Sequence, residues 1–92
     1  MINDIENKLL NLGFKRTFVK GVYKKRFVYA HVGIVLNEYG QVDLVNSGVQ
    51  INGYEYLNNE QQILEFNNAF IIYKSVLKEL GLRYEQDFKN VI

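Results

Sequence analysis

The spacing of apolar residues changes twice along the chain, and each change predicts a new kind of element. The first segment, up to position 14, has helical spacing, with apolar residues at Ile5, Leu9 and Leu12. Asn3 and Glu6 have the spacing of a capping box, which predicts the start of this helix. Gly13 followed by Phe14 predicts its end, because glycine readily adopts the left-handed conformation that stops a helix.

Between positions 15 and 57 apolar residues tend to alternate with polar ones, which is typical of β-strands. We expect a first strand that includes Phe18 and Val19, a turn or bulge at Gly21, and then one long strand from 22 to 36 that is interrupted at Gly33. Shorter strands are expected at 41–45, 49–51 and 54–56, separated by turns at 37–40 and 46–48. The pair Asn52-Gly53 predicts a two-residue type I′ hairpin, so the sheet should be antiparallel.

The last long segment returns to helical spacing after Asn58 or Asn59, either of which is a good helix cap. Its apolar positions are Ile63, Phe66, Phe70, Tyr73, Leu77 and Leu80, and Gly81 is expected to end it. Ala69, Ile72 and Val76 widen this stripe beyond the narrow seam of a coiled coil. We therefore expect the helix to lie across its own sheet, with a homodimer through the stripe as the alternative.

Together these elements predict an α+β fold: an N-terminal helix, an antiparallel β meander of four to five strands, and a long C-terminal helix packed on one face of the sheet. The chain of 92 residues, 48% of them hydrophobic, is expected to form one domain over 1–92. No apolar run approaches the roughly 20 residues that span a bilayer, so no membrane association is expected. With acids near the N-terminus and no cysteine, we expect a cytoplasmic protein.

The stretch YKKRFVYAHV, residues 23–32, places three cations beside aromatic residues and the single histidine of the chain. As part of one strand, its even positions from Val28 onwards form an apolar face, because alternate side chains point to opposite sides. Its odd positions carry Tyr23, Lys25, Phe27, Tyr29 and His31. We expect this second face to be at least half exposed, since an antiparallel sheet often leaves one face in water. The simpler alternative is that strands merely favour Tyr and Phe.

Charge is distributed unevenly, although the formal net charge is only +1. Between positions 7 and 37 there is no acid and there are seven cations: Lys8, Lys15, Arg16, Lys20, Lys24, Lys25 and Arg26. From position 38 onwards eight acids outnumber four cations. Six of the seven cations fall within the first predicted hairpin and should lie close together. Such a hairpin can bind phosphates or an acidic protein surface, or it can be neutralised by the acidic remainder of the chain.

The sequence contains no recognisable catalytic motif. A glycine-rich phosphate loop, a nucleophile elbow and the HExxH pattern are all absent. A single histidine excludes a histidine-rich metal site, and without cysteine there is no thiolate ligand or nucleophile. We therefore expect a protein without enzymatic activity, metal or cofactor.

The first hypothesis is a small non-enzymatic protein that binds another protein as an accessory or inhibitor. The abundance of Asn, Ile, Lys and Tyr is typical of AT-rich genomes, such as those of low-GC bacteria and their phages. A phage protein that acts on a host defence or gene-expression enzyme is one form of this hypothesis. The predicted contact residues are Arg16, Lys20, Lys24, Lys25, Arg26, Phe27, Tyr29 and His31. Arg26 and Tyr29 should contribute most, because interfaces favour arginine and tyrosine at their energetic centres.

Two alternatives remain open for the same hairpin, residues 15–31. It can bind nucleic acid, with cations on phosphates and Phe27 or Tyr29 stacked on an unpaired base. Roughly four to six phosphate contacts would then give a log–log salt slope near −3 to −5. The other alternative is a homo-oligomer, in which the basic hairpin of one copy faces an acidic surface of the next.

Overall fold

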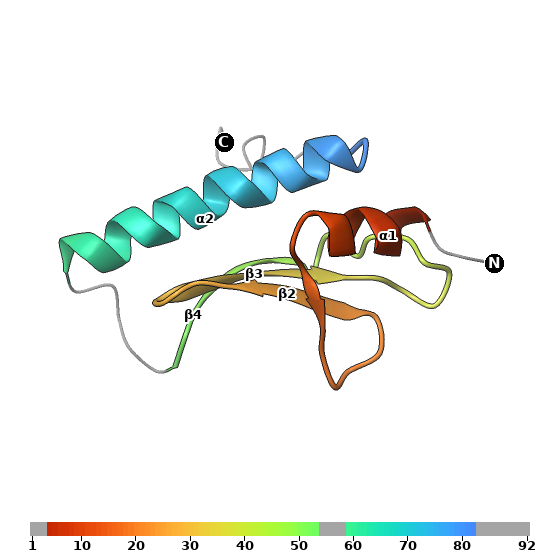
Figure 1. Ribbon diagram of the computed structural model, residues 1–92, viewed down its shortest axis with the longest axis horizontal. Helices are drawn as coiled ribbons and strands as arrows, with labels where there is room; N and C mark the ends of the chain where they lie inside the picture. Colours follow the sequence, from red (N-terminus) through yellow and green to blue (C-terminus); the bar gives the residue numbers. More distant parts are fainter. Residues whose placement is uncertain (1–3, 54–58, 83–92) are drawn as a thin grey trace.

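Two helices cover one face of a four-stranded antiparallel sheet in the computed structural model, which describes residues 4–53 and 59–82 (Figure 1). The elements follow in the order α1 (Asp4–Asn11), β1 (Lys15–Arg16), β2 (Val22–Arg26), β3 (Ala30–Val35), β4 (Gly48–Ile51) and α2 (Glu60–Glu79). Strands that follow each other in the chain are also neighbours in the sheet, which is therefore a meander. The predicted α+β fold with one helical layer is confirmed.

Both helices end at a glycine in the left-handed conformation. After α1, Gly13 has a φ of 93°, and the amide of Phe14 donates a hydrogen bond to the carbonyl of Leu9 at 3.0 Å. This is the Schellman arrangement, in which the last carbonyls of a helix find donors just beyond its end. α2 ends with the same geometry at Gly81, where φ is 77°. Both predicted helix ends are confirmed.

α2 begins as predicted after Asn59, whose side-chain oxygen accepts the amide of Gln62 at 2.8 Å. Its 20 residues make it about 30 Å long, and it packs on β3 and β4. The part of the apolar stripe from Phe66 to Leu80 packs against the protein's own core, as expected, whereas Ile63 at its start is 44% exposed. Neither described helix is both long and apolar enough to cross a bilayer. Asn3, the predicted cap of the first helix, lies outside the described residues.

The core fills the space between the helices and the covered face of the sheet. Its buried apolar side chains are Leu9, Phe14, Tyr23, Ala30, Val32, Ile34, Leu36, Ala69, Tyr73, Val76 and Leu77. The apolar face predicted for even positions 30–36 is therefore confirmed. Burial of side chains such as Val32 and Ile34, both at 0% exposure, stabilises the fold by about 1.5–3 kcal/mol each.

The segment 22–36, predicted as one long strand, is instead a hairpin that reverses at residues 27–29. β2 and β3 are paired as far as Arg26, which lies directly opposite His31. The alternation of residue types continues through the turn, and neither glycine nor proline marks the reversal in the sequence. Val28, predicted to lie in the core, is at the turn and is 75% exposed.

This reversal divides the residues that were predicted to share a face, because Tyr23 and Lys25 lie on one side of the sheet and His31 on the other. Directly opposite residues of an antiparallel pair point to the same side, so Tyr23 opposite Ile34 and Lys25 opposite Val32 lie on the helix-covered side. The other side, which we call the open face, carries Lys15, Val22, Lys24, Arg26, His31, Val35 and Gln50. The prediction of one aromatic and cationic face is therefore wrong, because the reversal of the chain at 27–29 places its members on opposite sides of the sheet.

The β1–β2 loop also differs from the prediction, because Phe18 and Val19 lie in the loop and not in a strand. The hydroxyl of Thr17 accepts the amide of Val19 at 3.2 Å, which is a short-range turn typical of Ser and Thr. Gly21 has a φ of 85°, so the turn predicted there is confirmed.

The segment 41–45, predicted as a strand, makes one isolated bridge, between Leu36 and Val42. The carboxylate of Asp43 accepts the amides of Val45 and Asn46 at 3.1 and 3.3 Å and turns the chain there. These bonds and the side-chain amide of Asn46, which has the largest effect, hold the pKa of Asp43 below its ordinary value. The chain therefore turns before a strand can extend.

The predicted type I′ turn at Asn52-Gly53 is also wrong. Such a turn needs a positive φ at both central residues, and Asn52 does not have one. The strand predicted at 54–56 lies outside the described residues. Asn52 instead uses its side chain to hold the β2–β3 turn, as described below.

A candidate binding groove at the edge of the sheet

Five of the six cations of the β1–β2 hairpin line one groove with a volume of about 660 Å³. Its lining residues are Gly13, Lys15, Arg16, Thr17, Phe18, Lys24, Lys25 and Arg26, which we call the basic groove. β1 pairs with Tyr23 and Lys24, so this groove runs along the edge of β2 at the point where β1 ceases to cover it. No acidic residue of the described chain lines it.

Two of the five cations are held by partners within the molecule. Arg16 donates to the carboxylate of Glu6 at 2.7 Å, and the hydroxyl of Tyr23 donates to the same carboxylate. These bonds, that from Arg16 first, hold the pKa of Glu6 below its ordinary value, and the pKa of Arg16 is raised in turn. Lys25 donates to the carbonyl of Leu12 at 2.9 Å, where a cation offsets the negative end of α1.

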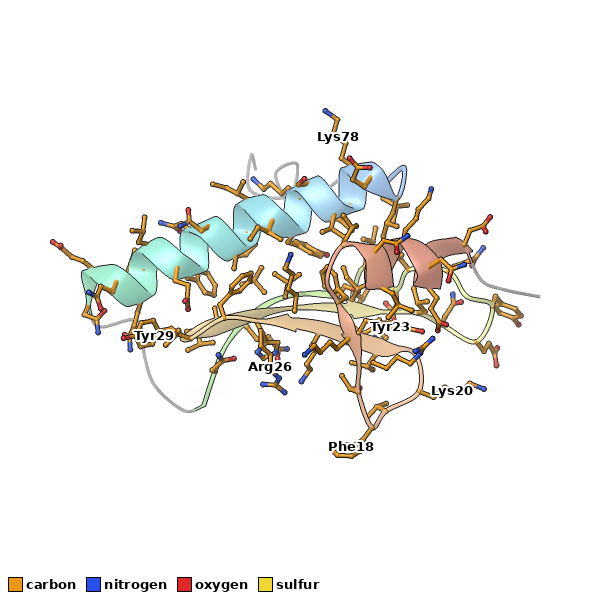
Figure 2. The ribbon with its side chains drawn as sticks, viewed as in Figure 1. Phe18, Lys20, Tyr23, Arg26, Tyr29 and Lys78 are labelled. Atoms are coloured by element: carbon orange, nitrogen blue, oxygen red, sulfur yellow. The ribbon has the colours of Figure 1, made fainter. Side chains whose placement is uncertain are left out.

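The other three cations, Lys15, Lys24 and Arg26, form a row on the open face. Lys15 lies opposite Lys24, and Arg26 follows two residues along the same strand, a step of about 6.6 Å. Within residues 4–53 and 59–82, none of the three side chains has a hydrogen bond or an ion pair. Figure 2 shows Arg26 on the side of the sheet away from the helices. Lys15 and Arg26 are exposed, and Lys24 is half-buried.

Phe18 gives the basic groove an aromatic side chain. It stands at the tip of the β1–β2 loop and projects on the same side of the molecule as Arg26 (Figure 2). Its side chain is fully exposed, at 109%, and the adjacent Val19 is 62% exposed. A large apolar ring in this position contributes nothing to the core, so the fold does not explain it.

The far end of β2 is held in place by Asn52. Its side-chain amide donates to the carbonyls of Phe27, Val28 and Ala30 at 2.8, 3.1 and 3.3 Å. The oxygen of Asn52 must then face His31, whose Nδ1 lies 2.7 Å away and donates the hydrogen. This network assigns the Nδ1–H tautomer to the neutral imidazole. His31 was predicted on a half-exposed face but is buried, with 7% exposure.

The same turn is tied to α2 by Glu65. Its carboxylate accepts the backbone amides of Val28, at 3.1 Å, and of Tyr29. An acid of the helix is therefore bound to the end of the hairpin and not to the row of cations. Among the described residues, the hairpin forms its ion pair between Arg16 and Glu6 of α1, so the proposed neutralisation of the hairpin by the acids of α2 does not occur there.

The structure brings some of the predicted contact residues together and separates others. Arg16, Lys24, Lys25 and Arg26 line the basic groove, whereas Lys20 lines a separate hollow beside Tyr39. The remaining three, Phe27, Tyr29 and His31, do not line the groove. Phe27 packs against the core, and Tyr29 lies at the turn beneath the start of α2 (Figure 2).

Four residues of the groove lining were not among the predicted contacts: Gly13, Lys15, Thr17 and Phe18. Lys15 was counted among the cations, but its position opposite Lys24 depends on the register of β1. Thr17 could have indicated that Phe18 lies in a turn, because its hydroxyl commonly binds a backbone amide two residues later. Local sequence therefore contained a signal for the loop but none for the register.

No group of three or more metal-binding side chains gathers within the described parts of the chain. Comparison with protein-family models, curated proteins and solved structures finds no match to this chain. Any functional proposal therefore rests on the basic groove and its surroundings.

Proposed function

We propose that this is a non-enzymatic binding protein that holds an acidic partner in the basic groove. The observation that supports it is the row formed by Lys15, Lys24 and Arg26 on the open face. Like charges directly opposite each other in a sheet destabilise it, so this arrangement costs free energy in the unbound protein. An acidic ligand removes that cost and gains charge-assisted hydrogen bonds.

The separation of charges in space supports the same proposal. Open-face residues of the four strands include no Asp or Glu, while α2 with Glu60, Glu65 and Glu79 packs on the opposite side of the sheet. Charges on an exposed face interact over about 8–10 Å at physiological salt, so a groove lined by one sign of charge attracts a polyanion even when the net charge is near zero.

Retention on two chemically different polyanions, immobilised heparin and immobilised poly-glutamate, tests this proposal. We expect the protein to bind both at about 50 mM salt and to elute as salt rises, because the contacts are electrostatic. Lys24→Gln/Arg26→Gln should elute at clearly lower salt. The matched control is Lys8→Gln/Lys78→Gln, which removes the same charge from exposed positions on the two helices. Figure 2 shows Lys78 pointing away from the sheet.

Two outcomes would overturn the proposal. One is a wild-type protein that passes through both matrices at 50 mM salt. The other is an equal shift in elution for the groove and control variants, which would mean that the matrices respond to net charge and not to the basic groove. Circular dichroism of each variant establishes that the fold is retained.

The remaining expectations from the sequence belong to this proposal as predictions. They are an accessory or inhibitory role against a host enzyme and a cytoplasmic location; the sequence-based expectation of a protein partner is the alternative that the oligonucleotide experiment below distinguishes from a nucleic acid. A homo-oligomer built from basic and acidic surfaces is the alternative that light scattering across a salt series would detect, because its mass would fall as salt rises.

A further inference from the structure

We propose that the acidic partner is a single-stranded nucleic acid, whose phosphates follow the row Lys15, Lys24 and Arg26 while one base stacks on Phe18. This inference rests on the proposed function and names the ligand of the same site. Proteins that bind single strands combine a positively charged groove that tracks the backbone with aromatic side chains on which bases stack. Both parts are present here, side by side, in the lining of one groove.

The composition of the groove favours a nucleic acid over a protein. Protein–protein interfaces are depleted in lysine and in charge at their centre, where tyrosine, tryptophan and arginine are enriched. Here Lys15 and Lys24 face each other in the lining of the groove, and the tyrosines lie elsewhere: Tyr23 is buried, and Tyr29 is at the β2–β3 turn. Lysine is an effective phosphate ligand because it acts as a point charge and needs no planar partner.

The geometry of Phe18 favours an unpaired base over a duplex. Its ring is fully exposed at the tip of a loop, where both of its faces can be reached from solvent (Figure 2). A base can stack on such a ring only if its face is not already occupied by neighbouring base pairs. The row also contains only three cations. A net charge of +1 does not favour the binding of a duplex that would contact a large part of the protein surface.

The number of free cations sets the expected salt dependence. The sequence suggested roughly four to six phosphate contacts, but Arg16 and Lys25 are held by Glu6 and by the carbonyl of Leu12. Three contacts to a single strand give a log–log slope of about −2, so affinity should fall about 20-fold between 50 and 200 mM salt. Lys24→Gln, which removes one contact, should change the slope to about −1.4.

Fluorescence anisotropy with a labelled single-stranded oligonucleotide of about 15 nucleotides, and with its duplex, tests the inference. Protein should be titrated to about 100 μM, because a few phosphate contacts give weak binding. We expect the single strand to bind more tightly than the duplex. Phe18→Ala should weaken single-strand binding by about 5- to 150-fold, the effect of losing one stacked base. The matched control, Tyr39→Ala, removes another exposed ring (78%) from a different loop and should change little.

The results separate a failure of this inference from a failure of the proposed function. One outcome is that heparin and poly-glutamate retain the protein through Lys24 and Arg26 while no oligonucleotide binds. In that case the ligand is an acidic protein and this inference is wrong. Equal losses for Phe18→Ala and Tyr39→Ala, or equal affinity for the single strand and the duplex, would also overturn it. If no polyanion of any kind binds, the proposed function fails and this inference fails with it.

Discussion

Lys15 and Lys24 lie directly opposite each other in the β1–β2 pair, on the face of the sheet that the helices leave open. Neither ammonium group has an acidic partner among the described residues. Cross-strand pairs of opposite charge stabilise a sheet, and pairs of like charge destabilise it. This pair therefore destabilises the fold, although it contributes to ligand binding under the proposed function.

Lys24→Glu should stabilise the fold while it weakens binding. The substitution turns a like-charge pair into an opposite-charge pair, for which we expect a gain of about 0.2–1 kcal/mol in the free energy of unfolding. Urea denaturation at low salt measures this gain, and heparin elution measures the loss of binding. The gain should shrink at about 1 M salt, where charges are screened within about 3 Å.

The double variant Lys15→Glu/Lys24→Glu is the control for this prediction. It restores a pair of like charges, so its stability should return close to that of the wild type, whereas retention on heparin should fall further. If both variants were equally stabilised, removal of positive charge in general would explain the result, and the pair itself would have no role.

The Glu6 carboxylate should make stability depend on acid pH. Its folded-state pKa lies below the ordinary value of 4.5 because Arg16 and Tyr23 donate hydrogen bonds to it. A lowered pKa means that its contribution is fully present above the ordinary value and is lost as the pH falls below it. We expect unfolding free energy to decline from about pH 5 to pH 3, and to decline less in Glu6→Gln. A decline as steep in Glu6→Gln as in the wild type would contradict this role of Glu6.

Tyr23 should make the free energy of unfolding depend on alkaline pH. Burial, and then the hydrogen bond to Glu6, raise the pKa of its hydroxyl above the ordinary value of 10.0. A raised pKa means that the contribution is present below that value and is lost as the pH rises through the folded-state pKa. In urea denaturation, the free energy of unfolding of Tyr23→Phe should therefore fall less steeply above pH 10 than that of the wild type. An unchanged slope would show that another group causes the alkaline loss.

Gly21 should tolerate a side chain much less well than Gly53. Both residues have a positive φ, of 85° and 76°, so alanine costs about 1–2 kcal/mol at either position. At Gly21 a Cβ would also lie 2.7 Å from the carbonyl oxygen of Leu36, whereas nothing lies within 4 Å at Gly53. We expect Gly21→Ala to be less stable than Gly53→Ala by about 1–3 kcal/mol in urea denaturation. Equal costs would mean that the backbone at Gly21 and Leu36 moves apart without a free-energy penalty.

Asn52 should hold the β2–β3 turn through its amide nitrogen. Asn52→Ala leaves the carbonyls of Phe27 and Val28 without that donor, which we expect to cost about 1–3 kcal/mol. Asn52→Asp keeps an oxygen for His31 but removes the donor, so it should be destabilised as well. Nitrogen-15 NMR of the wild-type His31 ring should show the Nδ1–H tautomer. An Asn52→Asp variant as stable as the wild type would contradict this role.

Local sequence was sufficient to predict the elements whose ends depend on a few consecutive residues. The ends of both helices at Gly13 and Gly81 and the cap at Asn59 are of this kind, because their hydrogen bonds span only three to five positions. The alternation from Ala30 to Leu36 likewise identified one buried face, since side chains of a strand alternate whatever its partner. These features determined the α+β architecture.

The tertiary structure alone decided where the chain reverses and which cations remain free. The turn at 27–29 has no local signature and is held by Asn52 and Glu65, which bind Val28 from 24 and 37 positions away. Lys24 and Lys25 are adjacent and chemically identical, yet one faces the open side and the other caps α1. Register and packing make that distinction, because they determine which side of a sheet each residue faces and which groups lie there to neutralise it.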